Sequence, residues 1–338
     1  MSAYVYLAIL LGFLFTLQPG QSTLAADDLS ETEIDIAKSA QAAPSEPSAT
    51  VNLLVLLGVV ESLHQELRSA IADEVLTSNV EYLELVDIHN PTFSWPDADQ
   101  VIATGVTGCK VAAQAPINVP VVCAFITAEK YAEIYFAQNE QTRQNLTAIV
   151  SDQPVSRQVA IATTIYPALS RFAVLLPSGR SPPADENSDI LFSEYRPDRA
   201  LATQLGDVTY MVDALLATPE TAIFNRSTLR TVLLTAYGYG KPVVGYSSAY
   251  VKAGALITAY SSPAQVIRQI AELTDLFSTS LSDALLSNSM LRRDLEFRVL
   301  SPKYFSIVDN PSVAKSLGLI KKLDFSADIS YEDKDFEP

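Results

Sequence analysis

The pattern of apolar and polar residues between Asp213 and Tyr260 predicts a strand, a polar loop, a helix and a second strand. The helix is expected to begin at Ser227, whose hydroxyl can accept a hydrogen bond from a backbone N–H of the first turn. Its apolar residues repeat at the spacing of one helix face: Leu229, Val232, Leu233 and Ala236. The short apolar segment Val243–Tyr246 then follows as a strand. A unit of this kind builds a parallel sheet and places its polar loops beyond the carboxyl ends of the strands.

A similar order of elements precedes this unit. The continuous apolar run Leu53–Val60 is typical of a strand that is covered on both faces. Ser62 is expected to begin a helix, with Gln65 completing a capping box. Further strands are predicted at Val80–Ile88, Val101–Thr104 and Val119–Ile126. The repeated order of strand and helix predicts a parallel sheet in this half of the chain.

The second half repeats the arrangement. Its strands are predicted at Phe172–Leu176, Ile190–Tyr195, Met211–Ala217 and Pro242–Tyr246. The periodicity of Met211–Ala217 also fits the end of a helix, and a strand is the preferred interpretation. Ser262, Pro263 and Gln265 have the residue types of a strong helix start. The predicted fold class is therefore α/β, with two Rossmann-like lobes, each a parallel sheet flanked by helices.

The two ends of the chain differ from this pattern. Tyr4–Leu17 is an apolar run that is short for a membrane span, and Leu24–Ala26 supplies small residues for a signal peptidase. Residues 1–26 are thus predicted to be a signal peptide; since no Lys or Arg precedes the run, an uncleaved anchor is the alternative. Residues 27–50 read as a flexible linker, and 321–338 as an acidic tail.

The composition limits the classes of partner. Hydrophobic residues make up 48% of the 338 residues, which is enough for a substantial core. The formal net charge of −16 argues against binding to nucleic acid or to an anionic membrane, because both carry negative charge themselves. A soluble protein without a nucleic-acid partner is expected.

The residues that usually perform catalysis are scarce. The chain has two histidines, His64 and His89, and neither has a partner at metal-ligand spacing. Gly238, Gly240 and Lys241 lack the spacing of a phosphate-binding loop. The sequence therefore predicts no enzyme, no catalytic residue, no metal and no cofactor. The two cysteines, Cys109 and Cys123, can form one disulfide in an exported chain, or can be two small buried apolar residues.

Hydroxyl, amide and phenol groups at predicted strand ends are the remaining candidates for a binding site. They are Ser62, Thr104, Thr107 and Thr127 in the first half, and Ser178, Asn225, Tyr246 and Ser247 in the second. Such groups can hold a small ligand through neutral hydrogen bonds. Each also has a structural alternative, since Ser, Thr and Asn cap helices and shape turns. One ligand site without metal, lined from both lobes, is predicted.

Several segments carry a resemblance to a known family. They are Ala148–Pro154 with Arg157–Gln158, Ala222–Thr228, Ser248–Ala255 with Tyr260–Ser261, and Pro302–Ser306 with Val313–Gly318. In these segments the chain resembles the periplasmic substrate-binding proteins of ABC transporters. The resemblance covers about Val51 to Leu319. It implies a first lobe at 51–147 plus 262–296, a second lobe at 148–261 plus 297–320, and hinge strands between them.

The resemblance implies a function as well. The chain is expected to be a periplasmic solute-binding protein that closes two lobes on a small molecule and delivers it to a membrane permease. The alternative is a periplasmic sensor that presents the same two-lobed fold to a receptor kinase or another partner. An enzyme on an α/β scaffold is the third hypothesis, which the absence of catalytic motifs disfavours.

Overall fold

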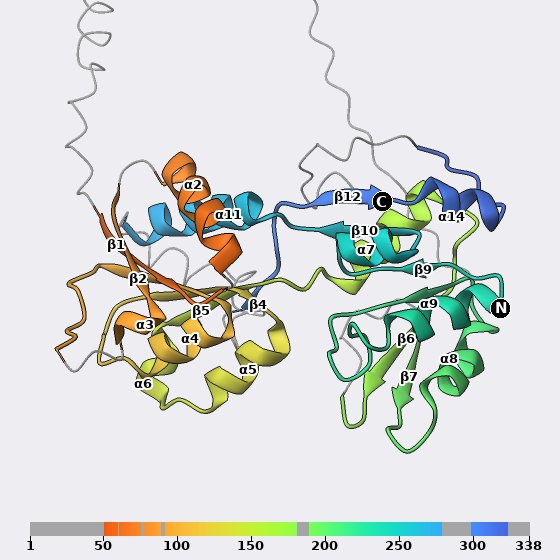
Figure 1. The fold of residues 1–338 in the computed structure, drawn as a ribbon, viewed down its shortest axis with the longest axis horizontal. Coiled ribbons are helices and arrows are strands. Elements are labelled where there is room, and N and C mark those ends of the chain that lie inside the picture. Colours follow the sequence, from red (N-terminus) through yellow and green to blue (C-terminus); the bar gives the residue numbers. More distant parts are fainter. Residues whose placement is uncertain are drawn as a thin grey trace, which may run out of the picture. The chain divides into compact units, whose positions relative to one another are not determined.

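The computed structural model describes residues 51–59, 61–75, 78–88, 92–180, 189–278 and 299–323. The predicted signal peptide, the linker and most of the acidic tail lie outside these residues. The described part contains two six-stranded sheets (Figure 1). The first has the strand order β11-β5-β4-β3-β1-β2, and the second has the order β12-β10-β9-β8-β6-β7.

All the strand pairs of the first sheet are parallel. Its strands are β1 (Val51–Leu57), β2 (Ser78–Glu84), β3 (Gln100–Thr104), β4 (Val121–Ile126), β5 (Leu146–Val150) and β11 (Val299–Leu300). The second sheet is parallel except for the pair of β10 and β12, which is antiparallel. Its strands are β6 (Phe172–Pro177), β7 (Ile190–Tyr195), β8 (Ala214–Leu216), β9 (Val243–Val244), β10 (Ile257–Tyr260) and β12 (Ser306–Asp309).

Helices cover both faces of the first sheet, because alternate residues of its buried strands point in opposite directions. Leu53 and Val55 pack in one core with α2 and α11, whereas Leu54 and Leu56 pack in another with α4 and α5. The helical elements are the 3₁₀ turn η1 (Glu61–Leu63), α2 (His64–Glu74), α3 (Leu85–Ile88), α4 (Gly105–Gln114), α5 (Ala128–Phe136), α6 (Glu140–Asn145) and α11 (Pro263–Ser278).

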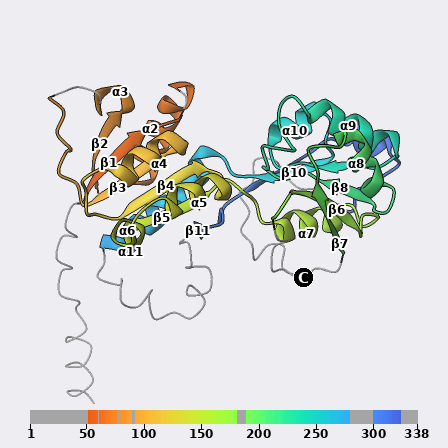
Figure 2. The same ribbon diagram turned by 90° about the horizontal axis from the view of Figure 1, so that it is seen from below.

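The second sheet is built in the same way. Phe172 and Val174 of β6 pack with α7, and Ala173 and Leu175 of the same strand pack with α8, α9 and α10. Figure 2 shows the latter three helices on one side of the sheet and α7 on the other. The helices are α7 (Val155–Ile165), α8 (Leu201–Thr209), α9 (Leu229–Gly238), α10 (Ser248–Ala253) and α14 (Pro311–Ser316). The predicted fold class, two helix-flanked and mostly parallel sheets, is confirmed.

The chain passes between the two sheets along three segments of the described part, which we call the crossings (Figure 1). They are Ser151–Pro154 between β5 and α7, Ser261–Ser262 between β10 and α11, and Ser301–Phe305 between β11 and β12. β5 and β11 both pair within the first sheet, so the first and third crossings begin after Val150 and Leu300. The expected domain boundaries lie a few residues earlier, and the division into domains stays a prediction.

Two predicted helix starts have different outcomes. Ser262 and Gln265 form the expected capping box: Ser262 N donates to Gln265 Oε1 (2.9 Å), and Gln265 N donates to Ser262 Oγ (3.3 Å). The helix predicted to begin at Ser62 begins as the 3₁₀ turn η1 and becomes α-helical at His64, with Leu63 at the N-cap position. The side chain of Ser62 lies outside the described residues, so its capping box stays a prediction.

Three further elements differ from prediction. The predicted strand Val80–Ile88 ends at Glu84 and continues as α3, since a helical turn lets both Leu85 and Ile88 pack on the same core. The stretch from Met211 becomes a strand only at Ala214, after the turn that ends α8. Ser227 does not cap α9, which begins at Leu229 with Thr228 at the N-cap position.

Candidate functional site

The candidate site is a cavity of about 740 Å³ beyond the carboxyl ends of strands from both sheets. Its volume is within the range of about 300–1,000 Å³ that is usual for small-molecule sites. It is lined by Glu66, Thr127, Ser151, Pro219, Tyr246, Ser247, Ser248, Lys252, Tyr260, Ser261, Ser262 and Pro263. Most of these residues follow β4, β5, β8, β9 and β10, which is where open α/β sheets bind ligands.

On the side of the second sheet the cavity wall includes Tyr246, the second residue after β9. Its hydroxyl donates to the backbone oxygen of Phe224 (3.0 Å), and its ring centroid lies 4.7 Å from that of Tyr250. Burial raises the pKa of the Tyr246 phenol, so the group is neutral at physiological pH. Tyr246 thus offers the cavity a fixed, uncharged aromatic surface.

The wall that belongs to the first sheet begins at an irregularity of β4. The register of β4 with β5 shifts between Ala124 and Ile126, and Phe125 has a φ of 57°, which is rare for a residue other than glycine. A bulge of this kind changes the direction of the residues that follow. Thr127 comes next in the cavity lining, and its hydroxyl accepts from Lys130 N (3.3 Å) at the start of α5.

The ionisable groups in and beside the cavity have opposite signs. Glu66 of α2 and Lys252 of α10 line it. Beside Ser151, the carboxylate of Asp152 accepts from Ala128 N (2.9 Å), and burial raises its pKa. Beside Pro219, burial raises the pKa of Glu220, although Arg180, whose guanidinium lies 3.2 Å from the carboxylate, opposes this shift. The cavity is therefore polar, with hydroxyl groups in the majority and one charge of each sign in its lining.

The structure brings three of the eight predicted site residues into this lining: Thr127, Tyr246 and Ser247. Thr104, Thr107, Ser178 and Asn225 are not among its lining residues. Ser62 lies in the backbone turn Glu61–Leu63, and its side chain is outside the described part. A ligand contact by any of the eight stays a prediction, and the geometry favours the three that line the cavity.

Three of the predicted side chains outside the lining have partners within the protein. Thr104 is fully buried; its hydroxyl donates to Leu56 O and accepts from Gly58 N, both at 3.0 Å. Asn225 Oδ1 accepts from Ser227 N (2.9 Å) and Thr228 N (3.1 Å) before α9. Ser178 donates to the carboxylate of Glu194. The contacts of Asn225 are those of a residue that shapes a turn, which was the structural alternative to ligand binding.

Sequence reasoning missed most of the second crossing and α10. The cavity lining includes Lys252, Tyr260, Ser261 and Ser262, and of these the sequence singles out only Ser262, as a helix start. A signal for them existed, because Tyr260 ends a buried strand and two serines follow before a helix. The position of Lys252 has no such signal, since it depends on how α10 lies against the strand ends.

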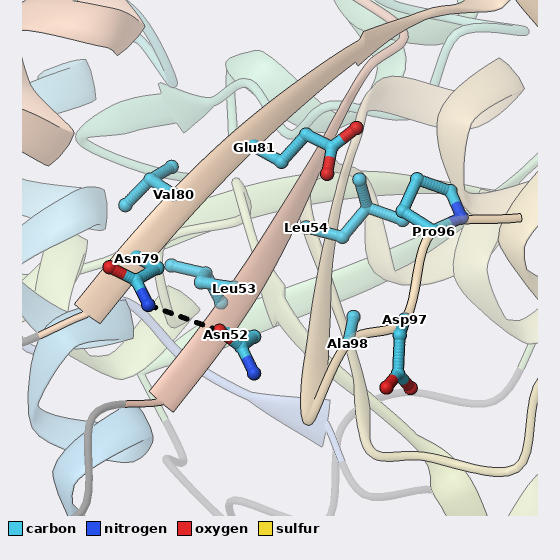
Figure 3. A pocket seen from close by; sticks show the side chains of 9 residues that line it. All are labelled: Asn52, Leu53, Leu54, Asn79, Val80, Glu81, Pro96, Asp97 and Ala98. Atoms are coloured by element: carbon cyan, nitrogen blue, oxygen red, sulfur yellow. Dashed lines mark hydrogen bonds between the residues drawn. The ribbon is translucent and has the colours of Figure 1, made fainter.

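Another hollow lies at the opposite ends of the first sheet's strands and is small, about 130 Å³. Figure 3 shows that its side chains come from β1, β2 and the segment Pro96–Ala98. There Asn79 Nδ2 donates to Asn52 Oδ1 (3.2 Å), and Asn52 N donates to Asp99 Oδ2 (2.8 Å). Polar groups at this end thus pair with one another, and the volume is below the usual range for ligand sites.

The two cysteines are neighbours in the core of the first sheet. Both side chains are completely buried, and both are free thiols in the structure. Burial and the adjacent Cys123 raise the pKa of the Cys109 thiol, which donates to Ala103 O (3.4 Å). The disulfide stays a prediction: thiol titration of the denatured, unreduced native protein should find no free thiol if it forms.

The described residues contain neither a candidate metal site nor a candidate membrane-spanning helix. Their His, Cys, Asp and Glu side chains include no group of three placed to hold a metal ion. Within the same residues, no helix combines the length and apolar character that crossing a membrane requires.

Comparison with known proteins gives matches only at the level of solved structures, because neither a family model nor a curated protein matches the chain. The ligand-free, open structure of a substrate-binding protein with adhesive properties from Clostridium difficile is 12% identical, with a TM-score of 0.52; the match covers 80% of this chain and 96% of that one. An ABC domain in complex with L-Trp from Streptococcus pneumonia is 16% identical (TM-score 0.45), covering 80% and 95%. A periplasmic ribose ABC transporter structure from Conexibacter woesei is 10% identical (TM-score 0.41), covering 82% and 97%.

The Clostridium difficile structure decides the fold, since its TM-score is the one of these three above 0.5. The chain has the two-lobed α/β fold of that substrate-binding protein. At this level of identity the likeness concerns the fold, and the ligand is a separate question.

Proposed function

We propose that the protein is a periplasmic solute-binding protein of an ABC-type uptake system, which closes on a small polar molecule and presents it to a membrane permease. The observation that carries the proposal is the 740 Å³ cavity at the carboxyl ends of strands from both sheets. A ligand in it would contact both halves of the fold. Such a ligand would favour a closed state by its difference in affinity for the closed and open states.

The lining indicates the kind of ligand. Serine and threonine hydroxyls can donate and accept hydrogen bonds, and Tyr246 and Tyr260 supply apolar ring surface. Glu66 and Lys252 carry opposite charges, so the site favours no strongly anionic or cationic molecule. A small, polar solute with little net charge is the class that fits, and the proposal assigns the protein no catalytic step.

A screen of small molecules by thermal shift, together with native mass spectrometry of protein purified from its own host, would identify a ligand. A molecule that binds only the folded protein raises its melting temperature by mass action. If neither method finds a ligand that binds in this cavity, the proposal is wrong.

Matched tyrosine variants then locate the ligand. Tyr246→Ala removes a ring from the cavity wall, and affinity is expected to fall about 10-fold or more. Tyr246→Phe keeps the ring and loses the hydrogen bond to Phe224 O, so it should bind nearly as well as the wild type. Tyr237→Ala, an exposed tyrosine of α9, is the control and should leave affinity unchanged. Isothermal titration calorimetry measures all three, and equal affinities for the wild type and Tyr246→Ala would contradict the assignment.

A further inference from the structure

The three crossings are connected by side chains as well as by the sheets at their ends. Gln153, in the first crossing, donates from Nε2 to the hydroxyl of Ser261 in the second (2.9 Å). That hydroxyl donates in turn to the backbone oxygen of Tyr304 in the third crossing (2.6 Å). One chain of hydrogen bonds therefore runs through all three segments.

Arg157, from the half of the protein that holds the second sheet, adds a further link to this series of hydrogen bonds. It lies in the first turn of α7 and is 5% exposed. Its Nη1 donates both to Gln153 Oε1 (2.6 Å) and to Pro302 O (2.8 Å), and its guanidinium lies 4.6 Å from the centroid of the Phe305 ring. The planar guanidinium thus links the first crossing to the third, which a point charge such as lysine could not do with the same geometry.

Helix α11 holds the third crossing from the side of the first sheet. Gln269 donates from Nε2 to Ser301 O (3.0 Å) and accepts at Oε1 from Lys303 N (2.8 Å). Gln265 of the same helix donates to Ser306 Oγ (3.0 Å). The third crossing is consequently fixed to a helix of each half, by Arg157 on one side and Gln269 on the other.

We propose that Arg157 and Ser261 join the three crossings into one unit whose segments loosen and move together. Arg157 is a positioning residue in this unit. Ser261 also lines the cavity, so it is the point at which a ligand can act on the crossings. The Ser261 proton is already donated to Tyr304 O, so a ligand group would donate to the Ser261 oxygen, either beside Gln153 or in its place. This last consequence rests on the proposed function; the joining of the crossings does not.

The alternative is that each crossing is an independent tether. The two arrangements differ in how far a local change spreads. Groups in one hydrogen-bond network show coupled effects, whereas independent sites respond separately. If the crossings are independent, loss of the Arg157 guanidinium would loosen only the two that it contacts, the first through Gln153 and the third through Pro302. If the crossings are joined, the same loss would loosen all three.

Hydrogen–deuterium exchange of the ligand-free protein, followed by mass spectrometry, separates these cases. Each crossing region has a hydrogen-bonded amide to follow: Ser151 N to Ile126 O (2.9 Å), Ser262 N to Gln265 Oε1 (2.9 Å), and Lys303 N to Gln269 Oε1 (2.8 Å). In Arg157→Met, exchange is expected to be about 10-fold faster at all three. The amide of Ser262 decides between the two cases, because Arg157 contacts the other two crossings directly. Unchanged exchange at Ser262 would overturn the proposal.

Arg143→Met is the matched control. Arg143 also holds backbone oxygens, those of Tyr135 (3.1 Å) and Phe136 (2.8 Å), but within the first half of the chain. Its loss should speed exchange around α5 and α6 and leave the three crossing amides unchanged. Ser261→Ala is the second test variant, for the case that Arg157→Met does not fold. It removes one oxygen and should also speed exchange in all three crossings, and an effect confined to the second would equally refute the proposal.

The same experiment is independent of ligand binding. If the ligand screen fails and the three amides still respond together, the proposed function is wrong and the joined crossings stand. If a ligand binds in the cavity and the amides respond separately, the joined crossings are wrong and the proposed function stands.

Discussion

The carboxyl ends of β1 and β3 differ from those of β9 and β10 in what occupies the space beyond the strands. Beyond β1 and β3, the backbone segments pack directly against one another at Gly58, Gly105 and Gly108. The Thr104 hydroxyl donates to Leu56 O and accepts from Gly58 N, so it is already hydrogen-bonded within the protein. Beyond β9 and β10, side chains turn toward a cavity. Hydroxyl residues follow strands in both places, so the residue type at a strand end does not identify a binding site. What distinguishes the two places is the room that the neighbouring backbone leaves beyond the strands.

The variant with the largest expected effect on stability is Gly58→Ala. A methyl group at Gly58 would lie 2.3 Å from both Gly108 N and Thr104 O, which are backbone atoms and cannot turn aside. We expect a loss of about 3 kcal/mol in the free energy of unfolding, measured in urea. Gly238→Ala is the control, because nothing lies within 4 Å of the added methyl in α9; it should change stability by less than about 1 kcal/mol, in the stabilising direction. Similar midpoints for the two variants would show that the closed end tolerates side chains.

Thr104→Val should have the second largest effect. Valine has nearly the same shape, but it leaves Leu56 O and Gly58 N without the hydroxyl between them, at a cost of about 2 kcal/mol. Thr107→Val, on the exposed side of α4, should stay within about 0.5 kcal/mol of the wild type. Chemical denaturation of both variants provides the measurement. A stable Thr104→Val that loses ligand affinity would instead make Thr104 a binding residue.

Asn225→Ala sharpens the comparison on the second sheet. The change removes the acceptor of Ser227 N and Thr228 N, so stability is expected to fall by about 1 kcal/mol, as for a lost helix cap. Asn225→Asp keeps an acceptor oxygen and should lose less. Calorimetry with the identified ligand should give unchanged affinity in both. A loss of affinity without a loss of stability would return Asn225 to the binding site.

The smallest expected effect concerns Asp152, beside the cavity. Burial raises the pKa of this carboxyl in the folded protein, so the folded state holds its proton more tightly than the unfolded state does. The contribution of Asp152 to the free energy of unfolding is therefore fully present at low pH. It is lost as pH rises from about 3.9, the usual pKa of Asp in an unfolded chain, to the raised pKa of the folded state. Asp152→Asn has no such group to titrate, so its free energy of unfolding should rise relative to that of the wild type across this pH range. Unfolding free energies from pH 3 to 7 measure it, with Asp73→Asn, exposed on α2, as the control for net charge. An advantage that is constant with pH would contradict the prediction.

The fold could be predicted from the sequence because short apolar runs such as Leu53–Leu57 are typical of strands covered on both faces. The parallel order then follows from the helices between them. The capping box at Ser262 could be read for a similar reason, since its contacts are local. The site could be predicted only in part. Tyr246 and Ser247 follow a strand and line the cavity, whereas Thr104 ends a strand where glycines allow the backbone to pack closely. That difference depends on Gly58, 46 residues away from Thr104, and local patterns do not report such contacts.

Because the described chain crosses between the sheets three times, it enters the fold in the first sheet at β1 and leaves it beside the second sheet at α14. An even number of crossings would have returned it to the sheet where it began. A donor and an acceptor fluorophore placed before Val51 and after Ser316 would thus report on different halves of the protein. Under the proposed function, the odd number of crossings in the described chain would let such a pair of labels report solute binding optically, with no label needed inside the cavity.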